Sequence, residues 1–246
     1  MWLRGLRELA RGIAQLLLPN SCLICDTPEG ERTDFRHGLC NDCHRAVTHD
    51  PRPACPRCAA TVGPHADTSE GCATCRSLSL GFGGAVRLGP YEGPLRDAIL
   101  RMKHSPGECL AEMMGRVFVE TASPRWQTER IDRVVPVPLH WRRRWERGYN
   151  QSATVAREIA TGLNVSYSPE VLRRIRYTPQ QTQPSAAARR ENVKGAFRAK
   201  SGASLAGVTV LLVDDVMTTG STLAEAARTL RQAGAKRILA AVLARR

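Results

Sequence analysis

The chain is poor in aromatic residues and has no long apolar run. Phe, Trp and Tyr make up 5 % of its 246 residues, which disfavours a single-strand-binding protein built on rows of stacking rings. No segment approaches the roughly 20 apolar residues of a membrane-spanning helix. The beginning of the chain lacks the small-residue cleavage site of a secretory signal. These absences predict a cytoplasmic protein without an integral membrane segment.

Several familiar catalytic motifs are also absent. The sequence contains no H-E-x-x-H, no nucleophile elbow and no G-x-x-x-x-G-K-[ST] phosphate loop. Positive charge is abundant instead, because 36 Lys and Arg against 23 Asp and Glu give a net charge of +13. An apolar fraction of 42 % is enough for a buried core. We therefore expect a folded protein with anionic partners, whether nucleic acid, phosphate esters or a membrane surface.

The composition divides the chain into three parts. Residues 1–19 carry leucines at helical spacing and predict an amphipathic helix that packs on the protein itself or contacts a membrane surface or a partner. Residues 20–78 are too poor in aliphatic side chains to fold around a core of their own and need a stabilising cross-link. Residues 79–246 alternate between strand and helix patterns, which predicts an α/β fold with an open, mostly parallel sheet.

The expected elements of the third part follow from its apolar periodicity. Helices are predicted over residues 94–103, 108–121, 151–162 and 222–233, and strands over 134–137, 208–213 and 237–243. The polar stretch 177–192 contains two prolines and predicts a long mobile loop.

Eight of the nine cysteines form four C-x-x-C pairs. Such a pair brings both sulfurs to one metal ion about 2.3 Å away. The simplest assignment groups consecutive pairs into two zinc ribbons, because each intervening gap fits one β-hairpin. An interleaved arrangement stays open at this point. The first ribbon would use Cys22, Cys25, Cys40 and Cys43, and the second would use Cys55, Cys58, Cys72 and Cys75. A closed site of four thiolates leaves no open coordination position, which predicts structural zinc.

Two cysteine features have other interpretations. The stretch from Cys40 to His44 matches the C-x-x-C-H pattern of haem attachment. That chemistry requires export and leaves the other three pairs unexplained, so zinc is favoured. The ninth cysteine, Cys109, lies in a helical pattern and is predicted to be a buried, inert thiol.

The stretch from Leu211 to Thr222 carries the clearest chemistry. An apolar strand runs into Asp214 and Asp215, and a loop of small hydroxyl residues around Gly220 leads into a helix. The backbone N–H groups of such a loop form a phosphate cradle at the positive end of the helix dipole. Adjacent carboxylates accept hydrogen bonds from sugar hydroxyls, so the pattern favours a ribose 5-phosphate. The competing interpretations are a Walker B strand, which here lacks its phosphate loop, and an ordinary strand–turn–helix with capping residues.

These residues carry a resemblance to a known family. Residues 213–222 (V-D-D-V-M-T-T-G-S-T) resemble the phosphoribosyl pyrophosphate (PRPP) motif of type I phosphoribosyltransferases. The chain as a whole resembles the ComF/GntX family, with blocks in order over nearly its full length. These blocks are 91–96 leading to Lys103, 135–140 with Arg143 and 147–151, and 178–181 leading to 189–197. Pro184 departs from the family pattern, which usually has Leu there.

The resemblance implies a double zinc ribbon followed by a type I phosphoribosyltransferase domain that binds PRPP with Mg²⁺. It places pyrophosphate at the loop after the first core strand, beside an arginine cluster. The implied ligand-binding residues are Leu139, His140, Asp214, Asp215, Thr218, Thr219, Gly220, Ser221 and Thr222. The residues expected to take part in catalysis are Lys103, Arg143, Arg147 and Arg189, the last on a loop that closes over the substrate.

Two functions are compatible with this resemblance. In the first, the chain transfers the phosphoribosyl group of Mg²⁺–PRPP to an unidentified acceptor in the context of DNA uptake and competence. In the second, it is a non-catalytic factor of natural transformation that senses PRPP or binds single-stranded DNA or proteins of the competence machinery. The two differ in acceptor-dependent release of pyrophosphate and in salt-sensitive DNA binding that survives loss of the acid pair.

Overall fold

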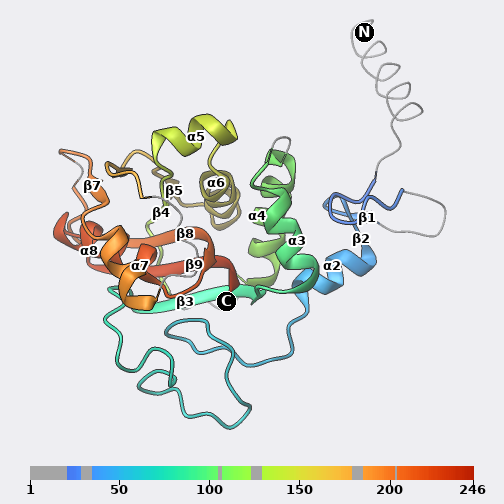
Figure 1. The fold of residues 1–246 in the computed structure, drawn as a ribbon, viewed down its shortest axis with the longest axis horizontal. Coiled ribbons are helices and arrows are strands. Elements are labelled where there is room, and N and C mark those ends of the chain that lie inside the picture. Colours follow the sequence, from blue (N-terminus) through green and yellow to red (C-terminus); the bar gives the residue numbers. More distant parts are fainter. Residues whose placement is uncertain (1–20, 29–34, 105–106, 123–128, 179–184, 203) are drawn as a thin grey trace, which may run out of the picture.

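A computed structural model describes residues 21–28, 35–104, 107–122, 129–178, 185–202 and 204–246. The helix predicted over residues 1–19 lies outside these ranges, as do residues 179–184, which include Pro184. The centre of the fold is a five-stranded sheet in which every neighbouring pair is parallel, with strand order β3-β9-β8-β4-β5 (Figure 1). The strands are β3 (Gly84–Pro90), β4 (Arg133–Pro136), β5 (Ser166–Tyr167), β8 (Thr209–Met217) and β9 (Arg237–Arg245). The open parallel α/β sheet predicted from the sequence is confirmed.

The central strands are apolar along their length because layers cover both faces of the sheet. β8 and β9 lie where strands were predicted, and both extend further toward their carboxyl ends. Asp214 and Asp215 therefore belong to β8, whereas the sequence pattern placed them just beyond it. β3 was not predicted, because its sequence G-A-V-R-L-G-P has no aliphatic run and places Arg87 in its middle.

Two packed layers cover the sheet. One face packs against α3 (Gly93–Arg101), α4 (Glu108–Ala122) and α6 (Gln151–Leu163). The other packs against α8 (Ser221–Gln232) and the segment that carries the last four cysteines of the C-x-x-C set. Figure 1 shows this second cysteine segment below β3, away from α3 and α4. Among the described residues, no helix combines the length and apolar character needed to cross a membrane.

The remaining elements are short. A hairpin of β1 (Phe35–Arg36) and β2 (Leu39–Cys40) leads into α2 (Asn41–Thr48), and α5 (Trp141–Arg147) follows β4. A second hairpin pairs β6 (Leu172–Arg174) with β7 (Phe197–Ala199), and α7 (Ala186–Val193) lies between these strands in the chain. The prediction of one continuous loop over residues 177–192 was therefore wrong from α7 onward. The Ser185 side chain caps this helix by accepting a hydrogen bond from Ala188 N.

Candidate functional site

The cysteines form two tetrads of consecutive C-x-x-C pairs. In each tetrad all four Sγ atoms lie within 4.8 Å of one another. Four sulfurs arranged as a tetrahedron around zinc at about 2.3 Å stand about 3.8 Å apart. The Cys25–Cys40 separation is 3.7 Å, Cys55–Cys75 is 3.8 Å and Cys58–Cys72 is 3.6 Å. The side chains are already at the spacing that zinc requires, and the donor set fits a structural zinc ion.

The tetrads show that each metal site is formed by two consecutive C-x-x-C pairs and not by interleaved ones. Cys40 and Cys43 converge with Cys22 and Cys25, which explains the C-x-x-C-H pattern without haem. The Thr27 hydroxyl lies 3.1 Å from Cys25 Sγ, and this hydrogen bond lowers the pKa of the Cys25 thiol to about 6. Cys109 belongs to neither tetrad and is exposed, so the prediction of a buried thiol was wrong.

The acid pair lies at the carboxyl end of β8, where ligands bind in open parallel sheets. The first residues of α6 hold it. Ser152 Oγ donates to Asp214 Oδ1 at 2.9 Å, and Gln151 Nε2 donates to Asp215 Oδ2 at 3.0 Å. Lys103 Nζ lies 3.6 Å from Asp215 Oδ2, which brings one predicted cation to the pair.

Tyr149 keeps the end of α3 close to this site. Its hydroxyl donates to the carbonyl of Met102, the residue before Lys103. Burial raises the pKa of Tyr149 to about 12, so the phenol stays protonated and keeps this donor role.

The surroundings of Asp214 change how readily this carboxyl group ionises. Burial, with the Asp215 charge beside it, raises the pKa of Asp214 from its ordinary value near 4 to about 7. The unfolded chain releases this proton near pH 4, and the folded chain releases it near pH 7. Ionisation of Asp214 therefore reduces the free energy of unfolding as pH rises through this window.

Asp214→Asn is expected to remove this pH-dependent loss of stability. The Tm of the variant should exceed that of wild type by at least about 2 °C at pH 8, and the difference should shrink toward pH 4. Thermal unfolding followed by circular dichroism across this range measures it. A Tm difference that is constant with pH would contradict the raised pKa.

The loop after β8 provides donors at the start of α8. Gly220 has φ of 77° in the left-handed region and is the N-cap of α8, a conformation that glycine adopts without strain. Thr219 Oγ1 and Ser221 Oγ lie 2.8 Å apart. A pocket of about 310 Å³ opens over Thr219, Gly220 and Ser221. These hydroxyls and the α8 N-terminus form an arrangement suited to a phosphate group.

The segment after β4 carries the arginine cluster. Leu139 and His140 lead into α5, and His140 Nδ1 accepts a hydrogen bond from Arg142 N at 3.4 Å as its N-cap. Burial, with the arginines around it, lowers the pKa of His140, so its ring is neutral at pH 7. Arg143 donates to the Thr178 carbonyl at 3.2 Å, which connects α5 to the segment after β6.

Two predicted residues lie on helices other than those that hold the acid pair. Arg147 ends α5, and Arg189 lies on α7. Among the described residues, neither guanidinium forms a hydrogen bond or ion pair with the acid pair or with residues 218–222. The neighbouring Arg190 lines the pocket over the loop instead. The sequence pattern did not distinguish Arg189 from Arg190, because the rotation of α7 determines which of the two side chains lines the pocket.

Other side chains at the site were not predicted. Gln151 and Ser152 hold the acid pair, and Arg190 lines the loop pocket. Arg174 lies partly buried over the Phe197 ring at 5.3 Å, hydrogen-bonded to Thr178, and its charge favours the ionised form of Asp214. Arg245, on β9, donates to the Met217 carbonyl at 3.2 Å and to the Thr218 carbonyl. Gln151 and Arg190 lie inside family blocks of the sequence, and this signal could have identified them. Arg245 contacts carbonyl groups 27 and 28 positions away, which no local pattern indicates.

Comparison with known proteins matches both parts of the chain to families. Residues 13–76 match the double zinc ribbon domain, and residues 150–246 match the phosphoribosyl transferase domain. DNA utilization protein YhgH of Salmonella typhimurium and that of Escherichia coli K12 are each 33 % identical over 224 residues, covering 89 % of this chain and 94 % of the relative. Competence protein F of Haemophilus influenzae is 31 % identical over 228 residues, covering 91 % and 96 %.

Among solved structures, the B. subtilis glutamine PRPP amidotransferase complexed with ADP and GMP is similar at 21 % identity, covering 58 % of this chain and 30 % of that one. Its TM-score of 0.40 is too low to support an argument. The relatives above match almost the whole length of the chain, and the two family models match its two ends. On this basis the chain belongs to the ComF/GntX family, in which a double zinc ribbon precedes a phosphoribosyltransferase domain.

Proposed function

We propose that the chain binds Mg²⁺–PRPP at the carboxyl end of β8 and transfers its phosphoribosyl group to an acceptor. The observation that carries this proposal is the placement of Asp214 and Asp215 beside the loop at the N-terminus of α8. Carboxylates accept hydrogen bonds from ribose hydroxyls, and the loop donates to the 5-phosphate one step away. A site for phosphate alone would gain nothing from two adjacent carboxylates, whereas a ribose phosphate uses both groups.

In this proposal the other predicted residues act on the pyrophosphate. Mg²⁺ carried with PRPP neutralises part of the pyrophosphate charge. Leu139 and His140 form the loop that faces the leaving group, and Lys103 and Arg143 add positive charge near it. Arg147, at the end of α5, and Arg189, on α7, add further positive charge around the leaving group in this proposal. Thr218 and Thr222 complete the phosphate loop.

The reaction is a substitution at the anomeric carbon of ribose. The bond from C1 to the pyrophosphate oxygen breaks, and its electron pair leaves with pyrophosphate. A lone pair of the acceptor forms the new bond to C1, and the acceptor proton passes to solvent. The protein's part is to place the two reactants, to stabilise the departing anion and to exclude water from a transition state with oxocarbenium character.

The names of the relatives support a role in DNA metabolism. The similar proteins are called DNA utilization protein and Competence protein F, and the alignments cover 94 % and 96 % of their lengths. We infer that it acts in DNA uptake or use, together with other proteins of that machinery.

The decisive experiment is calorimetric titration of the zinc-loaded full chain with Mg²⁺–PRPP. We expect saturable binding with one site per chain, and weaker binding when Mg²⁺ is omitted. A pyrophosphate-release assay with candidate acceptors then separates turnover from binding alone. Absence of binding to folded, zinc-loaded protein would exclude the transferase function.

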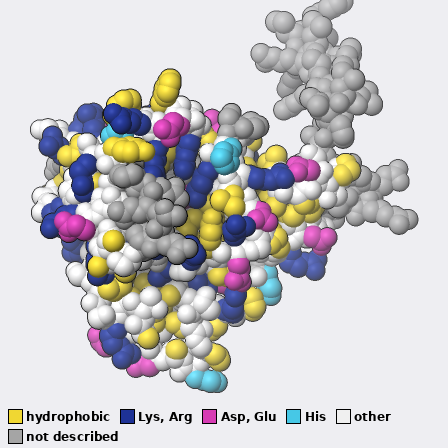
Figure 2. All heavy atoms as spheres, in the orientation of Figure 1, with side chains coloured by type: hydrophobic (Ala, Val, Ile, Leu, Met, Phe, Trp, Pro, Cys, Tyr) yellow, Lys and Arg dark blue, Asp and Glu magenta, His cyan; other side chains and the backbone are white. Residues whose placement is uncertain are grey.

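One surface supports binding of single-stranded nucleic acid as a second function. Trp141 and Trp145 on α5 are 66 % and 85 % exposed, and Tyr177 lies beside them. The Arg142 guanidinium carbon lies 5.3 Å from the Trp141 ring centroid and 5.6 Å from that of Tyr177. Figure 2 shows Lys, Arg and hydrophobic side chains next to one another at the top of the molecule, where α5 lies in Figure 1. Exposed rings among guanidinium groups suit stacked bases along a phosphate backbone.

Removal of the two exposed rings is expected to weaken this binding. Trp141→Ala with Trp145→Ala should reduce the affinity for a fluorescently labelled oligo-dT by roughly tenfold or more, since stacking contributes about 1–3 kcal/mol per base. The matched Trp→Phe pair keeps both rings and should retain most of the affinity. Fluorescence anisotropy at fixed salt measures the difference. Equal affinity of the alanine pair and wild type would show that charge alone binds the strand.

A further inference from the structure

Two arginines of the central sheet are almost fully buried, on neighbouring strands. Arg87 on β3 is 2 % exposed and Arg245 on β9 is 6 % exposed. A buried guanidinium is tolerated only when its donors are satisfied. Arg87 donates to the Ala59 carbonyl at 2.8 Å and to Asp50 Oδ2 at 2.8 Å. Both of these contacts lie in the segment that carries the second cysteine tetrad.

Arg245 connects that tetrad to the candidate phosphate loop. Its Nε donates to the carbonyl of Cys58, a tetrad residue, at 3.2 Å. Its Nη1 donates to the Met217 carbonyl at 3.2 Å and to the Thr218 carbonyl, where β8 becomes the loop. One rigid, planar group therefore holds backbone atoms of two segments that are far apart in the chain. The fork geometry of arginine suits this role better than the single ammonium of lysine.

Charge supports the same connection. Four thiolates and one Zn²⁺ carry a formal charge of −4 + 2 = −2. Arg245 lies next to this cluster through Cys58, and Arg57 lies between Cys55 and Cys58 in the sequence. A metal-loaded tetrad therefore attracts the buried cation that holds the loop.

The chain that leaves the second tetrad also forms a wall of the loop pocket. Arg57 donates to the Cys75 carbonyl at 3.0 Å and to the Leu78 carbonyl at 2.8 Å, which holds the exit segment in place. Residues 77–80 then line the 310 Å³ pocket together with Thr219, Gly220 and Arg190. A side chain built at Gly220 would come within 3.4 Å of Leu80, so the two segments are in close contact.

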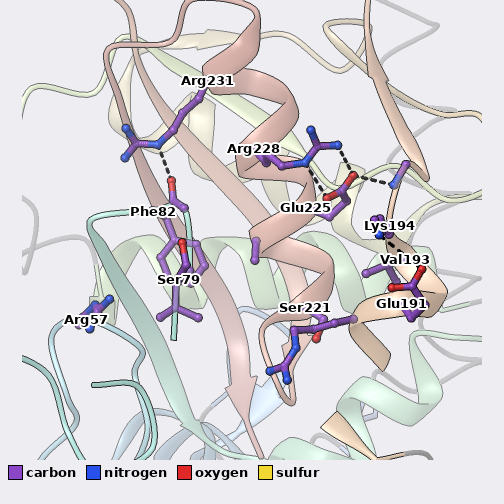
Figure 3. A pocket seen from close by; sticks show the side chains of 15 residues that line it. Arg57, Ser79, Phe82, Glu191, Val193, Lys194, Ser221, Glu225, Arg228 and Arg231 are labelled. Carbon is purple, nitrogen blue, oxygen red and sulfur yellow. Dashed lines mark hydrogen bonds and ion pairs between the residues drawn. The ribbon is translucent and has the colours of Figure 1, made fainter. Parts of the chain in front are cut away.

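A larger hollow of about 920 Å³ adjoins this pocket and shares residues with it. Figure 3 shows Arg57 and Ser79 from the second cysteine segment, with Ser221 at the start of α8 and Glu191 on α7, around this hollow. A phosphate ester on the loop would therefore lie within reach of the second cysteine segment.

The first tetrad has different neighbours. Cys22, Cys40 and Cys43 pack in the core on the α3 and α4 face. Arg101 on α3 forms an ion pair with Asp26 at 2.6 Å. On the α4 side, His37 Nε2 lies 3.2 Å from a Glu120 carboxylate oxygen. The two metal sites therefore lie in different cores, and the described contacts connect one of them to the loop.

We infer that the second zinc ribbon is a built-in part of the phosphate-ester site, and that Arg245 is the positioning residue that connects its metal centre to the phosphate loop. The inference rests on the proposed function for the identity of the ligand. The connection itself is a property of the protein without ligand and is tested separately.

The test compares two buried arginines of the same sheet. Arg245→Met removes the donors that join the tetrad to the loop, whereas Arg87→Met removes donors to the same ribbon and leaves the loop contacts intact. Hydrogen exchange followed by mass spectrometry is measured on the zinc-loaded full chain, with zinc content determined in parallel. We expect amide exchange over residues 217–222 to become at least about tenfold faster in Arg245→Met and to stay near the wild-type rate in Arg87→Met.

The outcomes separate this inference from the proposed function. Unchanged exchange in Arg245→Met, or an equal increase in Arg87→Met, would overturn the inference even if Mg²⁺–PRPP binds. Faster exchange confined to Arg245→Met would support it even if wild type binds no PRPP. If PRPP does bind, its affinity should fall roughly tenfold or more in Arg245→Met. Should Arg245→Met not fold, Arg245→Lys replaces it: faster loop exchange supports the inference, and a wild-type rate overturns it.

Discussion

Replacement of Asp214 and Asp215 together by asparagine is expected to reduce the affinity for Mg²⁺–PRPP by at least about 100-fold. Each carboxylate offers the ligand charge-assisted hydrogen bonds worth about 1.5–3 kcal/mol, and every 1.4 kcal/mol is a tenfold change in affinity. The substitution nearly preserves shape, so the loop over residues 218–222 stays in place. Calorimetric titration of both proteins at pH 8, above the raised pKa of Asp214, measures the loss under conditions in which wild-type Asp214 is ionised.

The control for this experiment is Asp97→Asn. Asp97 lies exposed on α3, where it pairs only with the neighbouring Arg96 in the described structure. Its variant therefore removes one negative charge, as each of the two site substitutions does, but leaves the site unchanged. Its affinity should equal that of wild type. A double variant that binds within threefold of wild type would show that the ligand lies elsewhere. The single variant Asp214→Asn keeps the fold at least as stable as wild type, so weak binding there cannot be attributed to unfolding.

Loss of either metal centre is expected to unfold the part of the protein around it. Cys43→Ser and Cys58→Ser should each lower the zinc content from two ions per chain to one. Structural zinc contributes about 10–16 kcal/mol in zinc-finger peptides, which is comparable to the whole stability of a typical domain. The tetrads lie in the cores on opposite faces of the sheet, so neither can substitute for the other. We expect a fall in Tm of more than about 10 °C or insoluble protein.

Cys109→Ser is the matched control for the zinc experiment. Cys109 is exposed and outside both tetrads, so its variant should keep two zinc ions and the wild-type Tm. Zinc is measured by atomic emission and stability by thermal unfolding. Retention of two zinc ions by Cys43→Ser or Cys58→Ser, with unchanged Tm, would contradict the assignment of structural metal. For a milder test, Cys58→His keeps four ligands and should retain zinc with partial stability.

The features that could be predicted from the sequence depend on local spacing. The C-x-x-C pairs identified both metal sites, because two thiolates three residues apart reach one ion without help from distant parts of the chain. The strand leading into Asp214 and the helix after Gly220 were likewise visible, since an apolar run, two acids and a glycine loop are neighbours in the chain. β3 escaped prediction because Arg87, a residue typical of surfaces, stands in its middle.

The features that could not be predicted depend on contacts between distant segments. Arg245 reaches Cys58 across 187 positions of the chain, and Ser152 reaches Asp214 across 62. No local pattern distinguishes such partners from surface residues. The helix α7 was not predicted because the prolines nearby indicated a loop. The rotation of this helix places Arg190, rather than Arg189, at the pocket.

The buried pair Arg87 and Arg245 bears on how this architecture can be engineered. Both guanidinium groups belong to the sheet, yet part of their hydrogen bonding comes from the cysteine-rich segment before it. A sheet cut free at residue 79 would lose the Ala59 and Asp50 acceptors of Arg87 and the Cys58 acceptor of Arg245, and would expose the apolar surface around both guanidinium groups. The ribbon therefore cannot be exchanged as an independent module. Any swap of ribbons between relatives must therefore carry the matching sheet residues with it.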